Sequence, residues 1–365
     1  TILYMRIMHL EFGRHLYGGA AQVRYLIEGL DDCGIENILI CPVNSEISKV
    51  TCATKVVELS IGGDLDWRLP TRLKNIISLY EPSVVHAHSR RGADTVGGWV
   101  SRYMEVPAVL TRRVDNREAA LWARLKYFPY DAVVGISSAV ERELLHHVGL
   151  PASRVHKVSS AMDTKRYSPA TERTRLTEVT GLDSSLFTIG IVGQFISRKG
   201  HALLFECLPE LFVRFPHARV LCFGQGPLEN ELKKNVLNKG LSSHVIFLGF
   251  RTDLSDLIPE LDLLVHPARQ EGLGVAVMEA MSSGVPVITS TAGGITDLLE
   301  NKVHGLTFES GDKSGLFNAM VLMISDEELR VRFRTAARKR IQEQFSVEKM
   351  SHRYIEIYNQ VLRSS

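Results

Sequence analysis

Short apolar runs alternate with stretches of helical periodicity along most of the chain. Runs of this kind are typical of buried parallel strands that carry helices on both faces of the sheet. They come in two series. The first comprises Met5–Leu10, Asn37–Cys41, Val84–Ala87, Ala108–Thr111, Ala132–Ile136 and Val155–Val158. The second comprises Thr188–Val192, Arg219–Phe223, Val245–Leu248, Leu263–His266, Val285–Thr289 and Leu306–Phe308. The two series predict an α/β fold with two doubly wound parallel-sheet domains.

A polar stretch over residues 168–185 separates the two series, so we expect the domain boundary there. This predicts an N-terminal Rossmann-like domain over residues 1–168 and a C-terminal one over residues 186–346. The remaining segment, 347–365, carries apolar residues at helical spacing, namely Met350, Tyr354, Ile357 and Val361. A helix with such an apolar face must pack against another element.

Composition and charge exclude several classes of protein. The formal net charge of +2 argues against a dedicated nucleic-acid binder, which usually carries a clear basic excess. The five cysteines form no CxxC pair and favour buried reduced thiols over a zinc or disulfide framework. No apolar stretch reaches the roughly 18–20 residues that span a bilayer, and the first residues lack a signal-peptide pattern. We therefore expect a cytoplasmic protein, or one that sits peripherally on the inner face of a membrane.

The sequence QEGLGVAVMEAMSSGVP follows the apolar run LDLLVHP and contains the sharpest functional signal. Glu271 lies in the expected strand-to-helix turn, where Gly272 and Gly274 let the backbone approach a ligand closely. A helix that begins near Leu273 points free N–H groups and its positive dipole end toward this turn. The pattern therefore predicts an anion site suited to a diphosphate.

Glu279 follows Glu271 by eight residues, about two helical turns. Two carboxylates beside one phosphate would repel it unless they hydrogen-bond to hydroxyl groups instead. Sugar and ribose hydroxyls are natural partners, so the pair indicates a nucleotide-sugar site. The alternative is that Glu279 is a solvated helix residue, but the surrounding glycines and the continuation GVPVI favour a ligand-binding role.

The block EGLGVAVMEAMSSGVPVITSTAGGITDLLE resembles the E-x7-E motif of retaining GT-B glycosyltransferases of family 4, the glycosyl transferases group 1. The resemblance implies two Rossmann-like domains that face a cleft, with a C-terminal helix that returns to the N-terminal domain. It also implies that a hexosyl group moves from a nucleotide-diphosphate sugar to an acceptor with retention of configuration, with no metal or other cofactor. We expect UDP as the nucleotide, a saccharide or lipid-linked acceptor, and a place in bacterial cell-surface glycan or glycolipid synthesis.

The segment IVGQFISRKG resembles the family's loop that holds the donor diphosphate. The resemblance implies that Lys199 and Arg198 neutralise charge on the departing phosphate. Gln194 stands where the family commonly has arginine, and Arg198 can compensate for it. The donor-binding residues that the resemblance implies are Gly18, Gly19, Gln194, Arg251, Gly272, Leu273, Gly274, Val275 and Glu279.

The segment VVHAH in the N-terminal half matches the family's His-x-His strand end. His88 corresponds to the histidine that lies near the transferred sugar in the family, and we expect the same contact here. His86, one strand period away, should point into the packing. The predicted catalytic residues are therefore Lys199, Arg198, Glu271 and His88.

Between His86 and Tyr130 the chain carries eight basic and four acidic residues, a local charge of 8 − 4 = +4. Within this region the segment 117–128 combines bases with apolar residues at helical spacing, namely Leu121, Trp122, Leu125 and Phe128. Such an amphipathic helix can bind an anionic acceptor or lie on an anionic membrane. The alternative is that its apolar face packs against the core of its own domain.

Two alternatives to a transferase remain open from the sequence. A nucleotide-sugar epimerase of the same architecture would also bind the donor, and so would a non-catalytic nucleotide-sugar-binding protein. The long E-x7-E block speaks against the first, and the intact residues Glu271, Glu279, Lys199 and His88 speak against the second. The pair Asp64 and Asp66 has the Asp-x-Asp spacing of metal-dependent transferases of another fold, but its surroundings favour chance.

Overall fold

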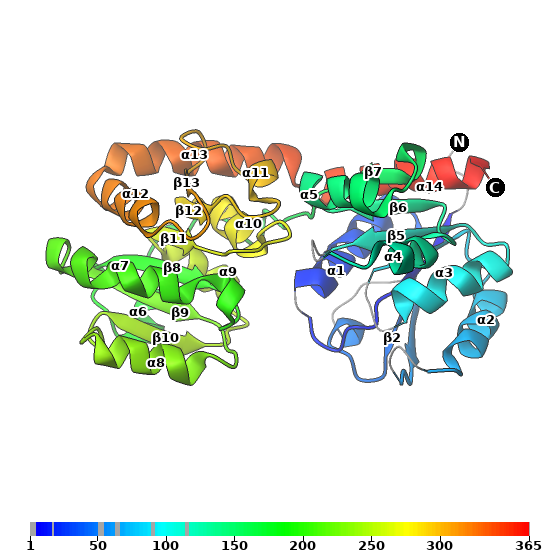
Figure 1. Ribbon diagram of the computed structural model, residues 1–365, viewed down its shortest axis with the longest axis horizontal. Coiled ribbons are helices and arrows are strands. Elements are labelled where there is room, and N and C mark those ends of the chain that lie inside the picture. The colour runs from blue at the N-terminus through cyan, green and yellow to red at the C-terminus, as the bar shows by residue number, and fades with distance from the viewer. Residues whose placement is uncertain are drawn as a thin grey trace. The chain divides into compact units, whose positions relative to one another are not determined.

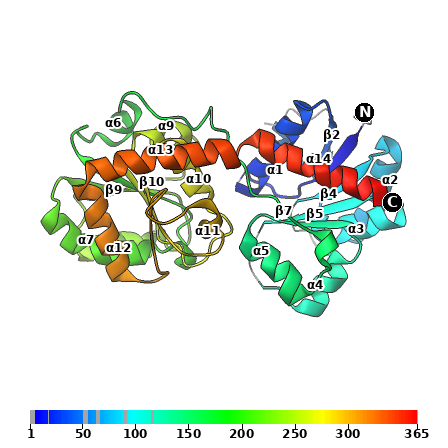
Figure 2. The same ribbon diagram turned by 90° about the horizontal axis from the view of Figure 1, so that it is seen from above.

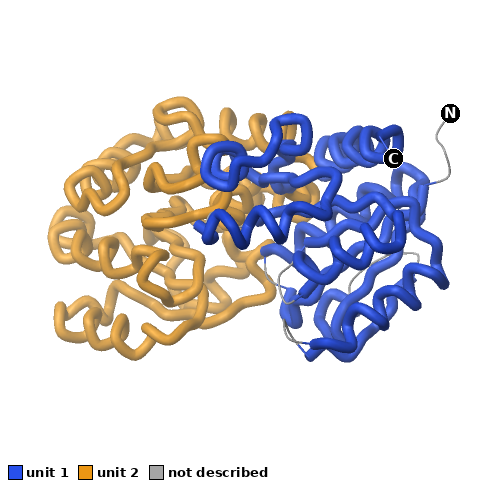
Figure 3. The backbone as a smooth tube through the Cα atoms, turned by 45° about the vertical axis from the view of Figure 1, so that its right-hand side comes forward, with its two compact units in different colours: residues 1–161, 347–365 blue, residues 162–346 orange. Residues whose placement is uncertain are grey.

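The computed structural model describes residues 5–16, 18–49, 55–62, 66–88, 92–113 and 117–364. The chain forms two compact units (Figures 1 and 3). Unit 1 contains residues 1–161 and 347–365, and unit 2 contains residues 162–346. Each unit is built on one parallel sheet, which confirms the predicted α/β class and the two Rossmann-like domains.

The sheet of unit 1 has seven parallel strands in the order β3-β2-β1-β4-β5-β6-β7. Their bounds are β1 Arg6–Leu10, β2 Glu36–Pro42, β3 Lys55–Leu59, β4 Val84–Ala87, β5 Ala108–Arg112, β6 Ala132–Gly135 and β7 Val155–Lys157. Six of these strands match the first predicted series. The sequence prediction missed β3, because KVVEL lies at the sheet edge, is nowhere fully buried and offers no continuous apolar run.

Successive residues of β1 and β4 point to opposite faces of this sheet, and each face has its own hydrophobic core. Ile7 and Val84 face one core with the helices α1 (Gly18–Asp31) and α14 (Val347–Ser364). Met8 and Val85 face the other with α2 (Leu69–Tyr80) and α3 (Ala93–Tyr103). The other helical segments of unit 1 are η1 Ile47–Lys49, α4 Ala120–Tyr127, α5 Ser138–Arg142, η2 Glu143–Val148 and η3 Ala152–Arg154.

The C-terminal helix α14 packs against α1, as Figure 2 shows. Gly29 permits this close approach, because a Cβ atom built there would lie only 2.1 Å from the Ser351 hydroxyl oxygen. Met350, Tyr354 and Val361 are buried in the core on that side of the sheet. The predicted return of the last helix to the N-terminal domain is therefore confirmed.

The sheet of unit 2 has six parallel strands in the order β10-β9-β8-β11-β12-β13. Their bounds are β8 Phe187–Val192, β9 Ala218–Phe223, β10 Val245–Gly249, β11 Leu263–His266, β12 Val287–Ser290 and β13 Leu306–Phe308. All six match the second predicted series. The helical segments are α6 Arg175–Thr180, η4 Ser197–Lys199, α7 His201–Arg214, α8 Glu229–Asn238, α9 Leu254–Leu257, η5 Ile258–Glu260, α10 Val275–Ser282, α11 Ile295–Leu298, α12 Lys313–Ser325 and α13 Glu327–Gln344.

The boundary between the units falls after Ala161, not within residues 168–185. The predicted limits of 168 and 186 are therefore displaced, because the polar stretch belongs to unit 2. Its charges have partners there: Arg173 donates to an Asp262 carboxylate oxygen at 2.5 Å. Leu176 is buried, and its N–H donates to Glu260. The polar composition of residues 168–185 suggested a linker between domains, because the sequence alone does not show these partners.

The apolar residues of segment 117–128 suggest that their side of helix α4 is buried, but the structure buries the opposite side of the helix. Ala123 and Tyr127 are buried, whereas the apolar residues Leu121, Trp122, Leu125 and Phe128 are exposed. The alternative that these apolar residues pack against the core is therefore wrong. Among the helices of the described part of the chain, none is long and apolar enough to cross a membrane. Asp64 lies outside the described residues.

Candidate functional site

The candidate residues of unit 2 gather where two neighbouring strands end. Strands β8 and β11 pair directly, so the loops that follow Val192 and His266 leave the same edge of the sheet. Ligands of parallel sheets bind at this edge. The loops also touch each other, because the Arg269 N–H donates to the Arg198 carbonyl oxygen at 2.7 Å.

A largely buried carboxylate with two basic partners lies between these loops. Lys199 Nζ donates to Glu271 Oε2 at 2.5 Å, and His266 Nε2 lies 2.9 Å from the same oxygen. Burial alone would raise the pKa of Glu271, but His266 and Lys199 outweigh burial and hold this pKa well below its usual range. Glu271 is therefore ionised at every physiological pH. We call Lys199, Glu271 and His266 the charged cluster.

The backbone conformation of Gly200 explains why a glycine follows Lys199 in the loop after β8. Its φ of +76° is unfavourable for other residues, and a Cβ atom there would lie 1.9 Å from the Pro267 carbonyl oxygen. The glycine thus brings Lys199 against the loop that carries Glu271. Arg198 and Gln194 on the same loop are exposed, and Arg198 donates to the Gln270 carbonyl oxygen at 3.3 Å.

The helix that follows Glu271 begins as expected. Gly274 precedes α10 with a φ of +86°, and a Cβ atom there would lie 2.6 Å from the Ile295 side chain. The first helical bonds to the Gly274 carbonyl come from Val277 and Met278, so the N–H groups of Val275 and Ala276 precede the helical ladder. Gly272 is half-buried and Leu273 is buried. These N–H groups and the helix dipole favour an anion beside the charged cluster.

Glu279 lies on α10 in a different environment from that of Glu271. The Tyr167 hydroxyl donates to Glu279 Oε1 at 2.8 Å. Burial raises the pKa of Glu279 to about 7, although the Tyr167 bond and the Arg166 charge oppose this shift. The alternative of a solvated helix residue is therefore wrong. At neutral pH the Glu279 carboxyl is close to half protonated, so it can donate as well as accept a hydrogen bond.

Arg251 follows β10, at the edge of the same sheet. Its guanidinium donates twice to the Asp253 carboxylate, at 2.8 and 2.5 Å. Arg175 adds a third bond to Asp253 at 3.2 Å. The Arg251 side chain thus fixes its own turn, which leaves the backbone of the turn as the part to face a ligand.

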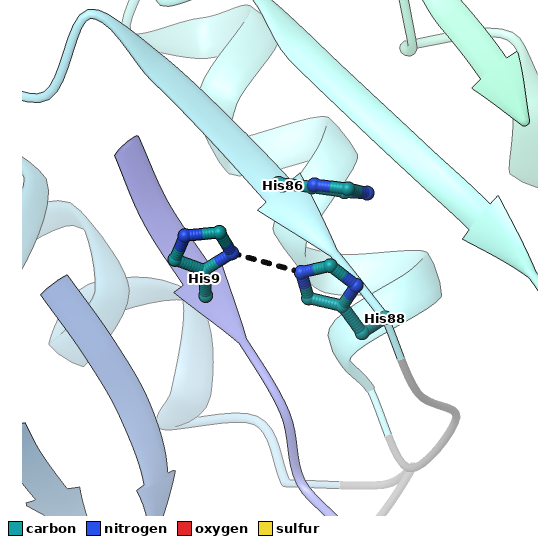
Figure 4. Close-up of side chains that lie close together, drawn as sticks. All are labelled: His9, His86 and His88. Atoms are coloured by element: carbon teal, nitrogen blue, oxygen red, sulfur yellow. Dashed lines mark hydrogen bonds between the residues drawn. The ribbon is translucent and has the colours of Figure 1, made fainter. Parts of the chain in front are cut away.

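Unit 1 has a group of three buried histidines, His9, His86 and His88, which we call the histidine cluster (Figure 4). His9 comes from β1, and His86 and His88 come from β4 and the residue that follows it. His9 Nδ1 and His88 Nε2 lie 3.0 Å apart. Burial lowers the pKa of all three, that of His9 to about 4, so the cluster is neutral at physiological pH.

The tautomers of His9 and His88 follow from Asn37. The Asn37 amide nitrogen donates to the Ile35 carbonyl oxygen at 2.8 Å, so its Oδ1 faces His9 Nε2 at 3.0 Å as an acceptor. His9 therefore carries its proton on Nε2 and accepts at Nδ1 from the Nε2–H of His88. The remaining His88 nitrogen, Nδ1, accepts from Arg113 at 3.4 Å.

His86 points into the packing, as predicted. Its Nδ1 lies 2.7 Å from the Tyr358 hydroxyl and its Nε2 lies 2.7 Å from the Thr111 hydroxyl. The Tyr354 hydroxyl joins Thr111 at 2.9 Å. Helix α14 thus supplies two tyrosines to the hydrogen-bond network that surrounds β4.

One ring nitrogen from each of the three histidines lies within 4.8 Å of the others, which is a spacing that could hold a metal ion. Every ring nitrogen of the cluster already has a hydrogen-bond partner. A cation would have to break the bond between His9 and His88 and lie close to Arg113. The donor set therefore fits a neutral hydrogen-bonded network better than a metal centre.

Gly18 and Gly19 open helix α1 in unit 1. A Cβ atom at Gly19 would lie 3.6 Å from Arg113 Cδ, so this turn lies against the arginine that also contacts His88. Tyr17 lies outside the described residues. The prediction for the N-terminal half named Gly18, Gly19 and His88, and the structure connects them through Arg113.

The sequence prediction missed five residues of these groups: His266, Tyr167, His9, Asn37 and Arg113. Three carried a signal. His9 and Asn37 interrupt otherwise apolar strands. His266 also ends the strand that leads into the Glu271 turn. The partners Tyr167 and Arg113 lie far from Glu279 and His88 along the chain, so only the fold reveals them.

Two Rossmann-like parallel-sheet domains in one chain are the architecture that the resemblance to GT-B glycosyltransferases implies. A profile of the family described as glycosyl transferases group 1 matches residues 172–340, and one described as glycosyltransferase family 4 matches residues 17–166. The chain belongs to this family, and the resemblance found in the sequence is confirmed.

Individual relatives agree with this assignment. The chain is 25% identical over 319 residues to the lipopolysaccharide core biosynthesis mannosyltransferase LpsB of Rhizobium meliloti, a match that covers 83% of this chain and 88% of that protein. It is 24% identical to the Escherichia coli UDP-Gal:alpha-D-GlcNAc-diphosphoundecaprenol alpha-1,3-galactosyltransferase, over 78% of this chain and 79% of that one. The fold matches that of Anabaena Alr3699/HepE in complex with UDP and glucose, with a TM-score of 0.86, 19% identity and coverage of 98% and 100%.

Proposed function

We propose that the protein is a retaining, metal-independent hexosyltransferase that takes its sugar from a UDP-sugar and builds a cell-surface glycan or glycolipid. The observation that carries this proposal is the charged cluster beside the N-terminus of α10. A nucleoside diphosphate leaves as an anion, and fixed positive groups are what stabilise it in a water-poor site. The Escherichia relative is named for a UDP-hexose donor, which supports the choice of donor. The Rhizobium relative is named as a mannosyltransferase of lipopolysaccharide core biosynthesis, which supports a hexosyl group and a cell-surface product.

Lys199 has the main role in this mechanism. An ammonium group has three donors, so its bond to Glu271 leaves capacity for a phosphate oxygen. Arg198, exposed on the same loop, and the N–H groups at Gly274 and Val275 add further positive potential. Their combined charge stabilises the diphosphate as its bond to the anomeric carbon breaks.

Glu271 binds the donor sugar in this proposal and does not attack it. Double displacement needs a carboxylate nucleophile beside the anomeric carbon. The bonds from Lys199 and His266 draw electron density from Glu271 and make it a weak nucleophile. Retention then follows if the acceptor oxygen attacks the face from which the phosphate leaves. The acceptor proton passes to the departing phosphate oxygen, which balances the step.

The remaining assignments extend the same donor pose. Glu279, close to half protonated, hydrogen-bonds the ribose hydroxyls, and the turn at Arg251 lies against the base through its backbone. Gly18 and Gly19 approach the phosphates with the N-terminus of α1. His88 contacts the transferred sugar region as a neutral group, with its tautomer held through His9.

We also propose that the protein works on the cytoplasmic face of a membrane and contacts it through residues 117–128. Two observations support this. The apolar side chains of α4 point outward, with Leu121 83% exposed. The described cysteines are all free thiols, which fits a reducing compartment.

The test is a comparison of UDP, GDP and ADP as stabilising ligands, followed by slow hydrolysis of the corresponding sugar donors with and without a chelator. We expect UDP to raise the melting temperature most, hydrolysis of a UDP-hexose to survive chelation, and the released sugar to keep its anomeric configuration. An inverted product would overturn retention, and activity lost to the chelator and restored by Mg²⁺ or Mn²⁺ would overturn metal independence. Formation of an epimerised donor without acceptor would instead identify an epimerase.

A further inference from the structure

The three tryptophans of the chain lie on or just before three helices of unit 1. Trp67 precedes α2, Trp99 lies on α3 and Trp122 lies on α4. All three are exposed, to 78%, 42% and 55% respectively. Tryptophan is normally well buried in a folded protein, so three exposed tryptophans on neighbouring helices need an explanation.

A groove runs between these helices. It has a volume of about 510 Å³, and its walls come from α2, α3 and α4. The residues that matter here are Pro70, Lys74, Trp99, Tyr103, Trp122 and Leu125. Phe128 extends the apolar wall, since its ring centroid lies 5.9 Å from that of Trp99. We call this region the α2–α4 face.

Cations accompany the exposed aromatic rings. The Lys74 ammonium lies 4.9 Å from the Tyr103 ring centroid, and the Arg102 guanidinium lies 4.9 Å from the Phe128 ring centroid. Both cations are exposed. Arg124 and Arg117 are also exposed on and before α4.

The acidic residues of this region are mostly neutralised. Asp94 and Glu118 both accept hydrogen bonds from Lys126, at 3.3 and 2.5 Å. Glu105, just beyond α3, is exposed. The accessible charge of the face is therefore mainly positive beside the aromatic rings.

Aromatic rings with basic neighbours are typical of protein surfaces that lie at a lipid interface, where the rings occupy the headgroup region and the cations meet anionic lipids. A second copy of this face would bring its cations against one another, which is unfavourable for self-association. We propose that the α2–α4 face binds an anionic lipid bilayer and that the groove receives a hydrocarbon chain of a lipid.

This inference deepens the proposed function, because it enlarges the membrane contact from α4 to three helices and assigns a lipid site to the groove. It rests on the proposed function in one respect only, because the synthesis of a cell-surface glycan or glycolipid is the reason for the protein to bind a membrane. The Escherichia relative is named for a diphosphoundecaprenol-linked acceptor, which combines an anionic group with a long hydrocarbon.

The position of the tryptophans provides a direct measurement, since Trp99 and Trp122 line the groove and the third, Trp67, lies in the turn just before α2. The full chain is mixed with vesicles of phosphatidylglycerol and phosphatidylcholine, and in parallel with vesicles of phosphatidylcholine alone. We expect a blue shift of the emission and co-sedimentation with the anionic vesicles only. Lipids brominated along the acyl chain should quench the emission if the groove holds a hydrocarbon chain.

Two double variants separate the apolar from the electrostatic contribution. Trp99→Ala with Trp122→Ala, and Lys74→Glu with Arg102→Glu, should each weaken vesicle binding by about tenfold or more. The control is Val213→Ala with Leu237→Ala, which removes exposed apolar side chains of unit 2 and should leave binding unchanged.

Equal binding by all variants, no binding by the wild type, or a dimer in sedimentation that the Trp99→Ala/Trp122→Ala variant loses would each overturn the proposal. Absence of quenching by the brominated lipids would overturn the hydrocarbon site in the groove. Hydrolysis of the donor in vesicle-free buffer reports on the proposed function separately. It should be the same for the wild type and the vesicle-binding variants, so failure of one proposal is distinguishable from failure of the other.

Discussion

The charged cluster of unit 2 and the histidine cluster of unit 1 lie at corresponding places, at the carboxyl ends of neighbouring parallel strands, but they differ in charge. Glu271 is ionised because Lys199 and His266 are bonded to it. His9 and His88 are neutral because they are buried and bonded to each other and to the uncharged Asn37 amide. The positive charge of Arg113 beside His88 also lowers the pKa of His88. Burial alone drives a group to its neutral form, and a bonded counter-charge reverses that effect.

In the function proposed above, this difference separates two roles within one enzyme. A cluster that keeps its charges under burial can act on an anionic leaving group. A neutral cluster instead holds side chains in fixed tautomers and orientations. Glu279 provides an internal control, because it is a second largely buried glutamate and lies on α10. It has a tyrosine where Glu271 has Lys199 and His266, and its pKa moves in the opposite direction.

Removal of the Lys199 ammonium group should have the largest effect of the changes considered. Lys199→Ala takes away the group that we propose to neutralise the diphosphate, so kcat/KM for transfer should fall by about 10²–10³. It also leaves the largely buried Glu271 with only His266 beside it, which should lower the free energy of unfolding by about 2 kcal/mol. Steady-state kinetics and urea unfolding measure the two effects. Lys239→Ala, at an exposed position of unit 2, is the control and should change neither. A fully active Lys199→Ala variant would contradict the role given to the charged cluster.

Displacement of the loop that carries Lys199 and Gly200 should have the next largest effect. Gly200→Ala puts a methyl group against the Pro267 carbonyl oxygen at a positive φ, so stability should fall by about 3 kcal/mol and activity should fall with it. Gly240→Ala is a matched control, since Gly240 has a φ of +68° and open space around its Cβ position. That variant should lose only about 1 kcal/mol. Equal losses in thermal unfolding would show that the contact with Pro267 is unimportant.

The pH dependence of stability distinguishes the two glutamates. The folded-state pKa of Glu279 is about 7, above its ordinary value, so the protonated carboxyl stabilises the fold below about pH 4.5. This contribution is lost as the pH rises through about 7, at up to about 1.4 kcal/mol per pH unit. Glu279→Gln, which cannot ionise, should therefore lose less stability than the wild type between pH 5 and pH 8.

The depressed pKa of Glu271 has the opposite consequence. Its contribution is present above its ordinary pKa and is lost only in strong acid, so Glu271→Gln should be destabilised to the same extent at pH 5 and pH 8. Melting temperatures of the wild type and both variants across this range provide the test. Identical pH profiles for the two variants would show that the environments of the two glutamates do not differ as described.

The smallest effect should come from giving the histidine cluster a counter-charge. Asn37→Asp places a carboxylate beside His9 Nε2 and should raise the pKa of His9 from about 4 by about one to two units. It also removes the amide donor to the Ile35 carbonyl, at a cost of about 1 kcal/mol. Histidine ring-proton NMR titrations measure the pKa. Asn238→Asp, on an exposed position of α8, should leave the titration unchanged.

Much of the fold could be predicted from local patterns. Twelve of the strands follow from apolar runs, and α14 follows from apolar residues at helical spacing, because periodicity expresses which face of an element is buried. The Glu271 turn, the Lys199-Gly200 pair and the family could also be identified, since they lie in short contiguous motifs. Strand β3 could not, because an edge strand with half-buried residues carries a weak pattern.

The partners of these residues, however, were decided only by the tertiary structure. Lys199 and Glu271 are 72 residues apart and His9 and His88 are 79 apart, so no local pattern predicts that they meet. The end of unit 1 at Ala161 and the outward side of α4 depend on which neighbours bury each face. The sequence determined which residues could carry charge. The structure decided which of them keep it, because ionisation under burial depends on a partner that the chain brings in from far away.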